Sequence, residues 1–130
     1  MNSLNHAMRV SASGLHAERF RMDIISTNIA NANSVAAPGQ TPYQRQIVEL
    51  SGGAEGVRVT RISRDTSPGR IEFDPNHPFR DSQNRVHYAN VDPIKEMVNM
   101  LSAGRAYEAN IAAFNSAKSM VRSALQIGKV

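Results

Sequence analysis

The residues of this chain best suited to metal or acid–base chemistry are its four histidines and its carboxylates. His6 and His16 lie near the N-terminus and His77 and His87 in the middle, so no two histidines have the i, i+4 spacing of a helical metal site. The stretch Asp74-Pro75-Asn76 matches the first ligands of a calcium loop, but the glycine and glutamate that should follow are missing. We therefore expect no metal site, and histidines that are exposed or bonded locally.

Motifs of the common enzyme classes are also missing. The chain has no P-loop, no GxGxxG and no GxSxG, and no cysteine that could form a thiolate or a disulfide. Glu72, Asp74 and Asp81 lie near predicted turns, and the sequence identifies no partner that would perturb their pKa values. The sequence thus predicts no catalytic site and no cofactor, and an enzyme is the least favoured class.

The basic character of the chain, net charge +4 and pI ≈ 10.0, does not favour nucleic acid as a partner. The excess of Lys and Arg is spread over the whole length, whereas a phosphate-binding face would concentrate it. No apolar stretch reaches the roughly 18 residues of a membrane span. The first residues, MNSLNHAMRV, also lack the apolar core of a signal peptide, so we expect export, if any, without a cleaved signal.

The longest predicted element is a helix in the C-terminal arm, residues 90–130. Asp92 is a good N-cap, Pro93 suits the first helical position, Lys95 stands where a capping box needs Glu or Gln, and Gly128 is expected to end the helix in a left-handed conformation. A helix this long measures about 50 Å, too much for a small domain to bury alone. Its apolar residues recur every three or four positions, as in a coiled coil, at Met97, Met100, Gly104, Tyr107, Ile111, Phe114, Ala117, Val121 and Ala124, with a second row at Ile94, Val98 and Leu101.

The partner expected for that helix is the N-terminal arm, residues 1–34. Its heptad positions are Met8, Leu15, Met22 and Ile29, interleaved with Leu4, Ser11, Glu18, Ile25 and Ala32. The polar residues Ser11 and Glu18 weaken this row, so we expect both arms to be stabilised mainly by assembly and the isolated monomer to be ordered mainly in its middle part. Small residues around Gly14 favour close helix packing.

Three asparagines, Asn28, Asn31 and Asn33, predict the end of the first helix, because Asn side chains compete for nearby backbone groups. Asn28 and Asn31 are one turn apart and share a face. Their amides could hold the following loop or a neighbouring helix, or they could simply mark a frayed helix end.

In the middle part, residues 35–89, apolar and polar residues alternate in short stretches, as in the strands of a small β domain. Strands are expected over residues 46–50, 57–60, 70–74 and 86–88, with a turn at Gly52-Gly53 and a type II turn at Ser67-Pro68-Gly69. So few short strands make only a thin core. The predicted fold class is α+β, in which the two terminal helices pack as an antiparallel coiled-coil pair and carry a small β-rich middle domain.

The sequence around the helix ends resembles the flagellar basal-body rod and hook proteins. The stretch from Ile24 to Ser34 is similar to their N-terminal signature, and the stretches Glu96–Met100, Arg105–Asn110 and Phe114–Met120 are similar to their C-terminal one. The linking segments 43–46, 74–78 and 88–92, together with the length of 130 residues, resemble the short proximal-rod (C-type) subunits. Residues 34–37 depart from the family, which often has a run of Thr there. The matching signature residues are Asn28, Asn31, Asn33, Arg105, Tyr107, Asn110, Asn115 and Lys118.

This resemblance implies a structural subunit of the bacterial flagellar basal-body rod, in the periplasm. Such subunits are exported unfolded by the flagellar type III export apparatus and polymerise helically into a hollow proximal rod that transmits torque and passes exported subunits. The implied partners are copies of the chain, other rod subunits and neighbouring export-gate or adaptor proteins. The helices are expected to form the inner layer of the rod and the β part an outer layer.

The residues expected at the assembly interface are Leu4, Met8, Leu15, Met22, Ile25, Ile29, Met97, Met100, Leu101, Gly104, Tyr107, Ile111, Phe114, Val121 and Leu125. A glycine in a helical row suggests that another backbone approaches Gly104. The alternative to a rod subunit is a soluble coiled-coil adaptor or export chaperone with a β insert, which would form a small closed oligomer.

Overall fold

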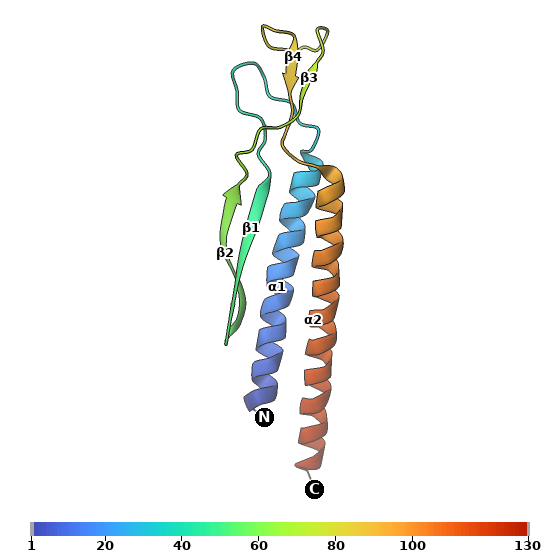
Figure 1. Cartoon of the computed structure of the whole chain (residues 1–130). Coiled ribbons are helices and arrows are strands. Elements are labelled where there is room, and N and C mark those ends of the chain that lie inside the picture. Colours follow the sequence, from blue (N-terminus) through green and yellow to red (C-terminus); the bar gives the residue numbers. More distant parts are fainter. Residues whose placement is uncertain (1, 130) are drawn as a thin grey trace. The chain divides into compact units, whose positions relative to one another are not determined.

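The computed structural model describes residues 2–129 and has the predicted α+β composition, with two long helices and a small β region between them in sequence (Figure 1). Strands β1 and β2 form one two-stranded sheet, and β3 and β4 form another. The elements in chain order are α1 (Asn2–Ala30), β1 (Gln46–Gly53), β2 (Gly56–Arg64), β3 (Ile71–Phe73), β4 (Arg85–His87) and α2 (Pro93–Ile127).

The chain forms two compact units, and each contains parts of both helices. The first unit comprises the chain up to Met22, Glu49–Arg61 and the chain from Leu101 on, and the second comprises Asp23–Val48 and Ile62–Met100. The three predicted segments, 1–34, 35–89 and 90–130, remain a prediction about domain organisation.

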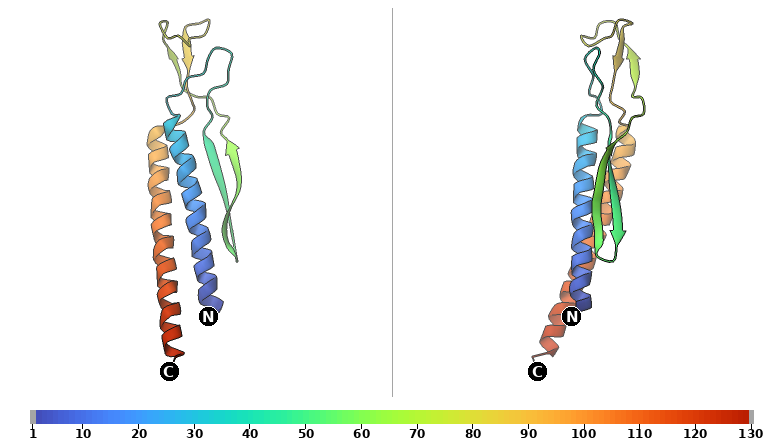
Figure 2. Two further views of the ribbon diagram at one scale, coloured as in Figure 1. Left: turned by 180° about the vertical axis from the view of Figure 1, so that it is seen from behind. Right: turned by 90° about the vertical axis from the view of Figure 1, so that its left-hand side faces the viewer.

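The pairing of the helices within each unit is antiparallel (Figures 1 and 2). In the first unit Gly14 lies against the Asn110 side chain, and in the second Asn28 bonds to Glu96.

Small side chains fill most of the buried helix positions. The buried positions are Ser11, Gly14, Ala17, Ala103 and Ala117 in the first unit, and Ile25, Asn28 and Glu96 in the second. The prediction of close packing around Gly14 is therefore confirmed, because a Cβ there would lie 2.7 Å from the Asn110 amide. The large apolar heptad residues of α1, such as Met8 and Leu15, are only half-buried.

The ends of the helices follow the predicted capping with one exception. Asp92 Oδ1 accepts hydrogen bonds from the amides of Ile94 (3.0 Å) and Lys95 (3.4 Å), which caps α2. At the other end Gly128 donates to the Ala124 carbonyl (3.1 Å). The prediction of a left-handed Gly128 is wrong, since the glycines with positive φ in residues 2–129 are Gly39 and Gly56.

The β1–β2 hairpin turns two residues later than predicted. Gly52 and Gly53 continue β1, and the turn falls at Ala54-Glu55. The following Gly56 has φ +113°, and a Cβ there would lie 2.1 Å from Ser13 Oγ of α1. Ser13 Oγ also accepts the Val57 amide (2.9 Å). Gly56 is thus required both by its backbone conformation and by its close contact with α1.

In the second unit β3 and β4 pair antiparallel, with Glu72 opposite Val86. The predicted type II turn at residues 67–69 is wrong, because Gly69 does not have the positive φ that position i+2 requires. Its glycine serves a close approach instead: a Cβ on Gly69 would lie 2.2 Å from the Tyr88 carbonyl oxygen. The core beside these strands is thin, as predicted, with Ala32, Ala89 and Val91 in contact with Tyr43.

Candidate functional site

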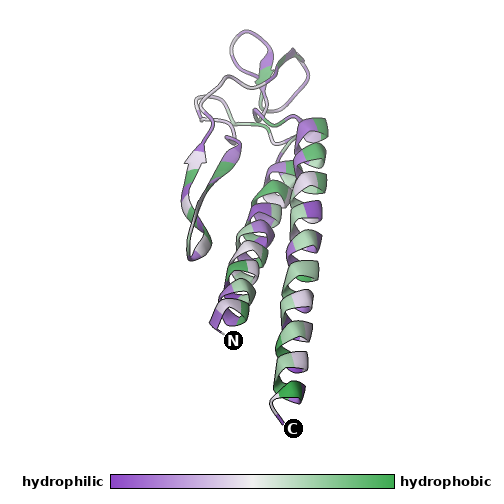
Figure 3. Cartoon of the chain, turned by 60° about the horizontal axis from the view of Figure 1, so that its bottom comes forward, coloured by the Kyte–Doolittle hydropathy of each residue, from purple (hydrophilic) through white to green (hydrophobic). Residues whose placement is uncertain are grey.

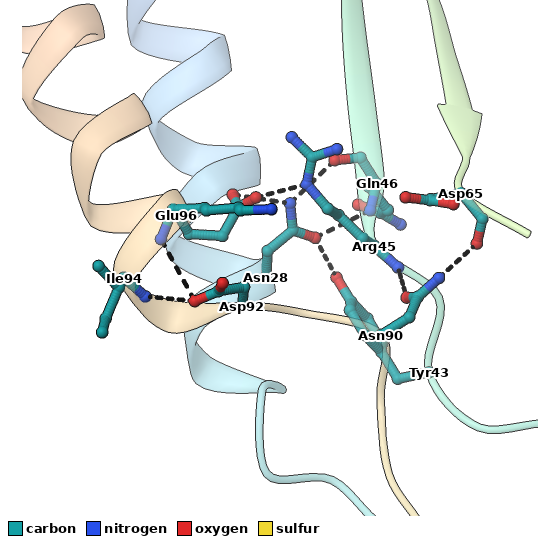
Figure 4. A network of polar contacts seen from close by, with 10 residues as sticks. Asn28, Tyr43, Arg45, Gln46, Asp65, Asn90, Asp92, Ile94 and Glu96 are labelled. Atoms are coloured by element: carbon teal, nitrogen blue, oxygen red, sulfur yellow. Dashed lines mark hydrogen bonds and ion pairs between the residues drawn. The ribbon is translucent and has the colours of Figure 1, made fainter. Parts of the chain in front are cut away.

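A buried asparagine organises the second unit (Figure 4). The Asn28 side chain is 1% exposed. Its Nδ2 donates to the Gln46 carbonyl (2.8 Å) and to Glu96 Oε2 (3.3 Å). Its Oδ1 accepts from the Gln46 amide (2.9 Å) and from the Tyr43 hydroxyl (2.8 Å). Two donor hydrogens and two acceptor lone pairs are all that a side-chain amide offers, so Asn28 is fully satisfied in this site.

Asn28 also contacts an ion pair between the buried Glu96 and the partly exposed Arg45. Glu96 on α2 is 1% exposed, and its Oε1 accepts from Arg45 Nε. Burial and the negative charge of Glu96 raise the pKa of the Tyr43 hydroxyl. The hydroxyl therefore stays protonated and donates a hydrogen bond to Asn28 Oδ1. The charges in this cluster are paired and the hydroxyl is protonated, which suits a structural junction and leaves no activated nucleophile.

Asn90 extends the cluster to the loop after β2. Its Oδ1 accepts the Arg45 amide (2.6 Å), and its Nδ2 donates to the carbonyls of Asp65 (2.8 Å) and Ser67 (2.9 Å). Asp65 Oδ1 in turn accepts the Ser67 amide (2.8 Å). Hydrogen bonds from the Ser67 side chain and from this amide lower the pKa of Asp65. The cluster therefore joins the end of α1, the start of β1, the loop after β2 and the start of α2.

Asp81 organises the turn before β4, contrary to the expectation that it has no partner. Its carboxylate accepts the amides of Gln83 (2.8 Å) and Arg85 (2.9 Å) and contacts His87 Nε2 (3.0 Å). These bonds hold the pKa of Asp81 well below its usual range. His77 accepts the Phe79 amide (3.0 Å), so His77 and His87 are locally bonded, as predicted.

Within residues 2–129, no group of three or more His, Asp or Glu side chains could hold a metal ion. None of the described helices is apolar enough over sufficient length to cross a membrane.

An exposed apolar face on α2 is the most conspicuous surface feature. In the second unit Ile94 is 74% exposed, Met97 54% and Val98 59%. In the first unit Leu101, Ile111, Met120 and Leu125 are also exposed, and apolar residues recur along α2 to its last turn (Figure 3). Exposed apolar side chains in such a series on one helix indicate a surface for contact with another protein.

The residues predicted for the assembly interface fall into two groups. The exposed group is Met97, Leu101, Ile111 and Leu125. The others are half-buried or buried in the chain itself: Leu4, Met8, Leu15, Met22, Ile25, Ile29, Met100, Gly104, Tyr107, Phe114 and Val121. No neighbouring atom lies within 4 Å of the position a Cβ would take on Gly104, so the chain itself supplies no close backbone approach there.

The predicted signature residues are also divided. Asn28 is buried in the cluster described above, whereas Asn31 caps its own helix by donating to the Thr27 carbonyl (2.9 Å) and accepting from Ser34 (3.1 Å). Asn110 donates to the Ala106 carbonyl (2.9 Å), and Tyr107 is half-buried. The remaining four, Asn33, Arg105, Asn115 and Lys118, are exposed.

The sequence does not predict that Arg45, Asn90 and Glu96 belong to one cluster. A signal was present, since Glu96 lies among apolar residues in the first turn of a helix, where a lone acid needs a partner if it is buried. The partner could not be identified from sequence, because Arg45 is 51 residues away.

Comparison with known proteins gives matches over nearly the whole chain. Residues 8–36 match the family model "Flagella basal body rod protein", and residues 82–127 match "Flagellar basal body rod FlgEFG protein C-terminal". The chain is 38% identical to the flagellar basal-body rod protein FlgC of Bacillus subtilis, over 95% of this chain and 97% of the relative. It is 40% identical to FlgC of Borreliella burgdorferi (93% and 95%) and 33% identical to FlgC of Aquifex aeolicus (99% and 100%).

Proposed function

Since this chain belongs to the family of flagellar basal-body rod proteins and is a structural subunit of the rod, we propose that it polymerises helically into the hollow proximal rod. There it transmits torque and lines the path of exported subunits. Its proposed partners are copies of itself, other rod subunits, neighbouring export-gate or adaptor proteins, and the flagellar type III export apparatus. The proposed location is the periplasmic part of the basal body, and the role requires no catalysis.

The observation that carries this proposal is the exposed apolar face of α2. Ile94, Met97 and Val98 lie on the first turns of a helix that already packs against α1 through other positions. A monomer in water gains nothing from exposing three large apolar side chains, and their burial between subunits would contribute roughly 1.5–3 kcal/mol for each one fully covered. A contact between unlike surfaces of identical chains generates a helical filament when the rotation does not close.

The proposal is tested by deleting the gene and restoring it with an epitope tag in a flagellated host. We expect the deletion strain to be non-motile and to lack rods in purified basal bodies, and the tagged chain to restore both and to co-purify with the rod in several copies. Recovery of the chain only as a small closed oligomer outside basal bodies would favour an adaptor or chaperone and would overturn the proposal.

A further inference from the structure

In the first unit, α2 carries two rows of residues with the alternating three- and four-residue spacing of a coiled coil. The inner row lies on the side that packs against α1, and Gly14 of α1 lies against Asn110 in this row. None of its members is exposed, and they are Ala103, Tyr107, Asn110, Phe114, Ala117, Val121 and Ala124. The outer row lies roughly a third of a turn away around the helix. Its members are Leu101, Gly104, Glu108, Ile111, Asn115, Lys118, Arg122 and Leu125.

The outer row is not covered by the described part of the chain, residues 2–129. Leu101, Ile111 and Leu125 are exposed, and so are the polar members of the row. At Gly104 nothing lies within 4 Å of the position a Cβ would take, which leaves room for a facing side chain. A helix with two such rows packs between two other helices, because each row forms one seam. Since α1 fills the inner seam, the outer seam requires a helix from outside the chain.

The charges of the outer row define the chemistry of that second helix. Glu108, Lys118 and Arg122 form no ion pair with other side chains of residues 2–129. A charge that becomes buried between two helices needs an opposite charge on the facing helix, because an unpaired buried charge is strongly destabilising. The facing row must therefore offer a base for Glu108 and acids for the two cations, with apolar residues between them.

A second copy of this chain does not complete these pairs. The outer row holds one acid and two bases, so two outer rows packed together bring two acids for four bases in any register. The exposed charged residues of α1 are Arg9, Arg19 and Asp23, again with more bases than acids. Charge complementarity therefore selects a helix of a different chain.

We propose that the outer row of α2 packs along a helix of a different protein, whose facing row carries more acids than bases. The inference rests on the proposed place in the rod and adds the chemistry of one neighbour. The two helices lie side by side, and Gly104 receives a large apolar side chain of the partner helix. Because the contact joins unlike chains, it does not link copies of this chain to one another.

A photocrosslinking amino acid in place of Ile111 tests this partner directly. The variant is expressed in flagellated cells that lack the unmodified chain, and basal bodies are purified after irradiation. We expect the main product to join this chain to a helix of a different chain with an excess of Asp and Glu in its facing row, as identified by mass spectrometry of the crosslinked peptides. The same substitution at Asn115, also in the outer row, should give the same product. The matched control at Ser116, about a third of a turn away, should not.

Charge is tested in the same background. Lys118→Glu combined with Arg122→Glu should lower the recovery of this product about fivefold or more, through weaker crosslinking or through loss of the chain from basal bodies. Lys118→Arg combined with Arg122→Lys keeps both charges and should change little.

Three results would overturn the inference and leave the rod function standing: incorporation without a product from the outer row, products that join only copies of this chain, or full recovery after charge reversal. Absence of the unmodified chain from basal bodies would instead overturn the proposed function.

Discussion

The side chain of Asn28 and the backbone of Gln46 exchange two hydrogen bonds, of 2.8 Å and 2.9 Å. The amide of a helical residue thus serves as the pairing partner of the first residue of β1. The arrangement fixes where the strand leaves the helix, because both backbone groups of Gln46 are used by one rigid side chain.

Asn28→Ala is expected to destabilise the chain by about 1–3 kcal/mol, since it removes four hydrogen bonds at a buried position, two to the Gln46 backbone, one to Tyr43 and one to Glu96. The measurement is chemical denaturation of the purified chain. Asn31→Ala is the control, and it should cost less because the bonds of Asn31 are local and its Thr27 contact is exposed. Equal losses from both substitutions would contradict the special role of Asn28.

Arg45→Ala should destabilise the chain by about 3 kcal/mol, the low end of the range for breaking a buried pair, because Glu96 is left buried and charged while Arg45 itself is partly exposed. The matched variant Arg45→Ala with Glu96→Gln removes both charges. We expect the double variant to recover part of the loss in the same denaturation experiment, and a purely additive result would show that the two charges are not coupled.

Gly56→Ala and Gly104→Ala should have opposite effects. At Gly56 the added methyl group would clash with Ser13, and φ of +113° is unfavourable for alanine. We expect these two effects to lower the free energy of unfolding by about 1–3 kcal/mol. At Gly104 nothing lies within 4 Å, so Ala should stabilise the helix by about 0.4–1 kcal/mol. The melting temperatures of the two variants would show the difference. Gly104→Leu remains predicted to block incorporation into the rod by overpacking a contact between subunits.

The sequence predicted the helices and strands better than the contacts between them, because those contacts join residues that are far apart in the chain. Asp92 and Pro93 predict the start of α2, and the three asparagines predict the end of α1, because the capping of a helix depends on a few neighbouring residues. Gly69 is required because the backbone of Tyr88, 19 residues later in the chain, lies close to it. Local turn rules cannot detect this contact and therefore predicted a type II turn instead.

Which side of each helix is buried could also be predicted only in part, because burial depends on contacts between distant residues. Met97 and Ala117 both fit a three-four spacing, but only the structure shows that Ala117 packs within the chain while Met97 is 54% exposed. In a helix that is apolar on more than one side, spacing alone cannot tell which side the chain covers itself. The side of each helix that faces the other is determined by small residues such as Ala103 and Gly14, which allow the helices to approach closely.

Acidification should weaken the turn around Asp81. The folded-state pKa of this carboxylate lies below its ordinary value of 3.8, so its contribution to stability is present above that pH and is lost progressively as the pH falls from there toward the lower folded-state pKa. Hydrogen exchange of the Gln83 and Arg85 amides should accelerate, relative to the intrinsic rates, between pH 5 and pH 3. Asp81→Asn should exchange faster at pH 5 and change little on acidification, and a wild-type profile as flat as that of the variant would contradict this account.

Recovery of a Val98 variant in purified basal bodies tests whether the exposed apolar face of α2 is the surface by which this rod subunit assembles. Val98 is 59% exposed, so Val98→Glu should leave the circular dichroism and melting temperature of the purified chain unchanged. We expect Val98→Glu to be exported but missing from basal bodies, in cells that are non-motile, whereas Val98→Ile should be incorporated normally. Normal incorporation of Val98→Glu would show that this face of α2 is not the assembly surface.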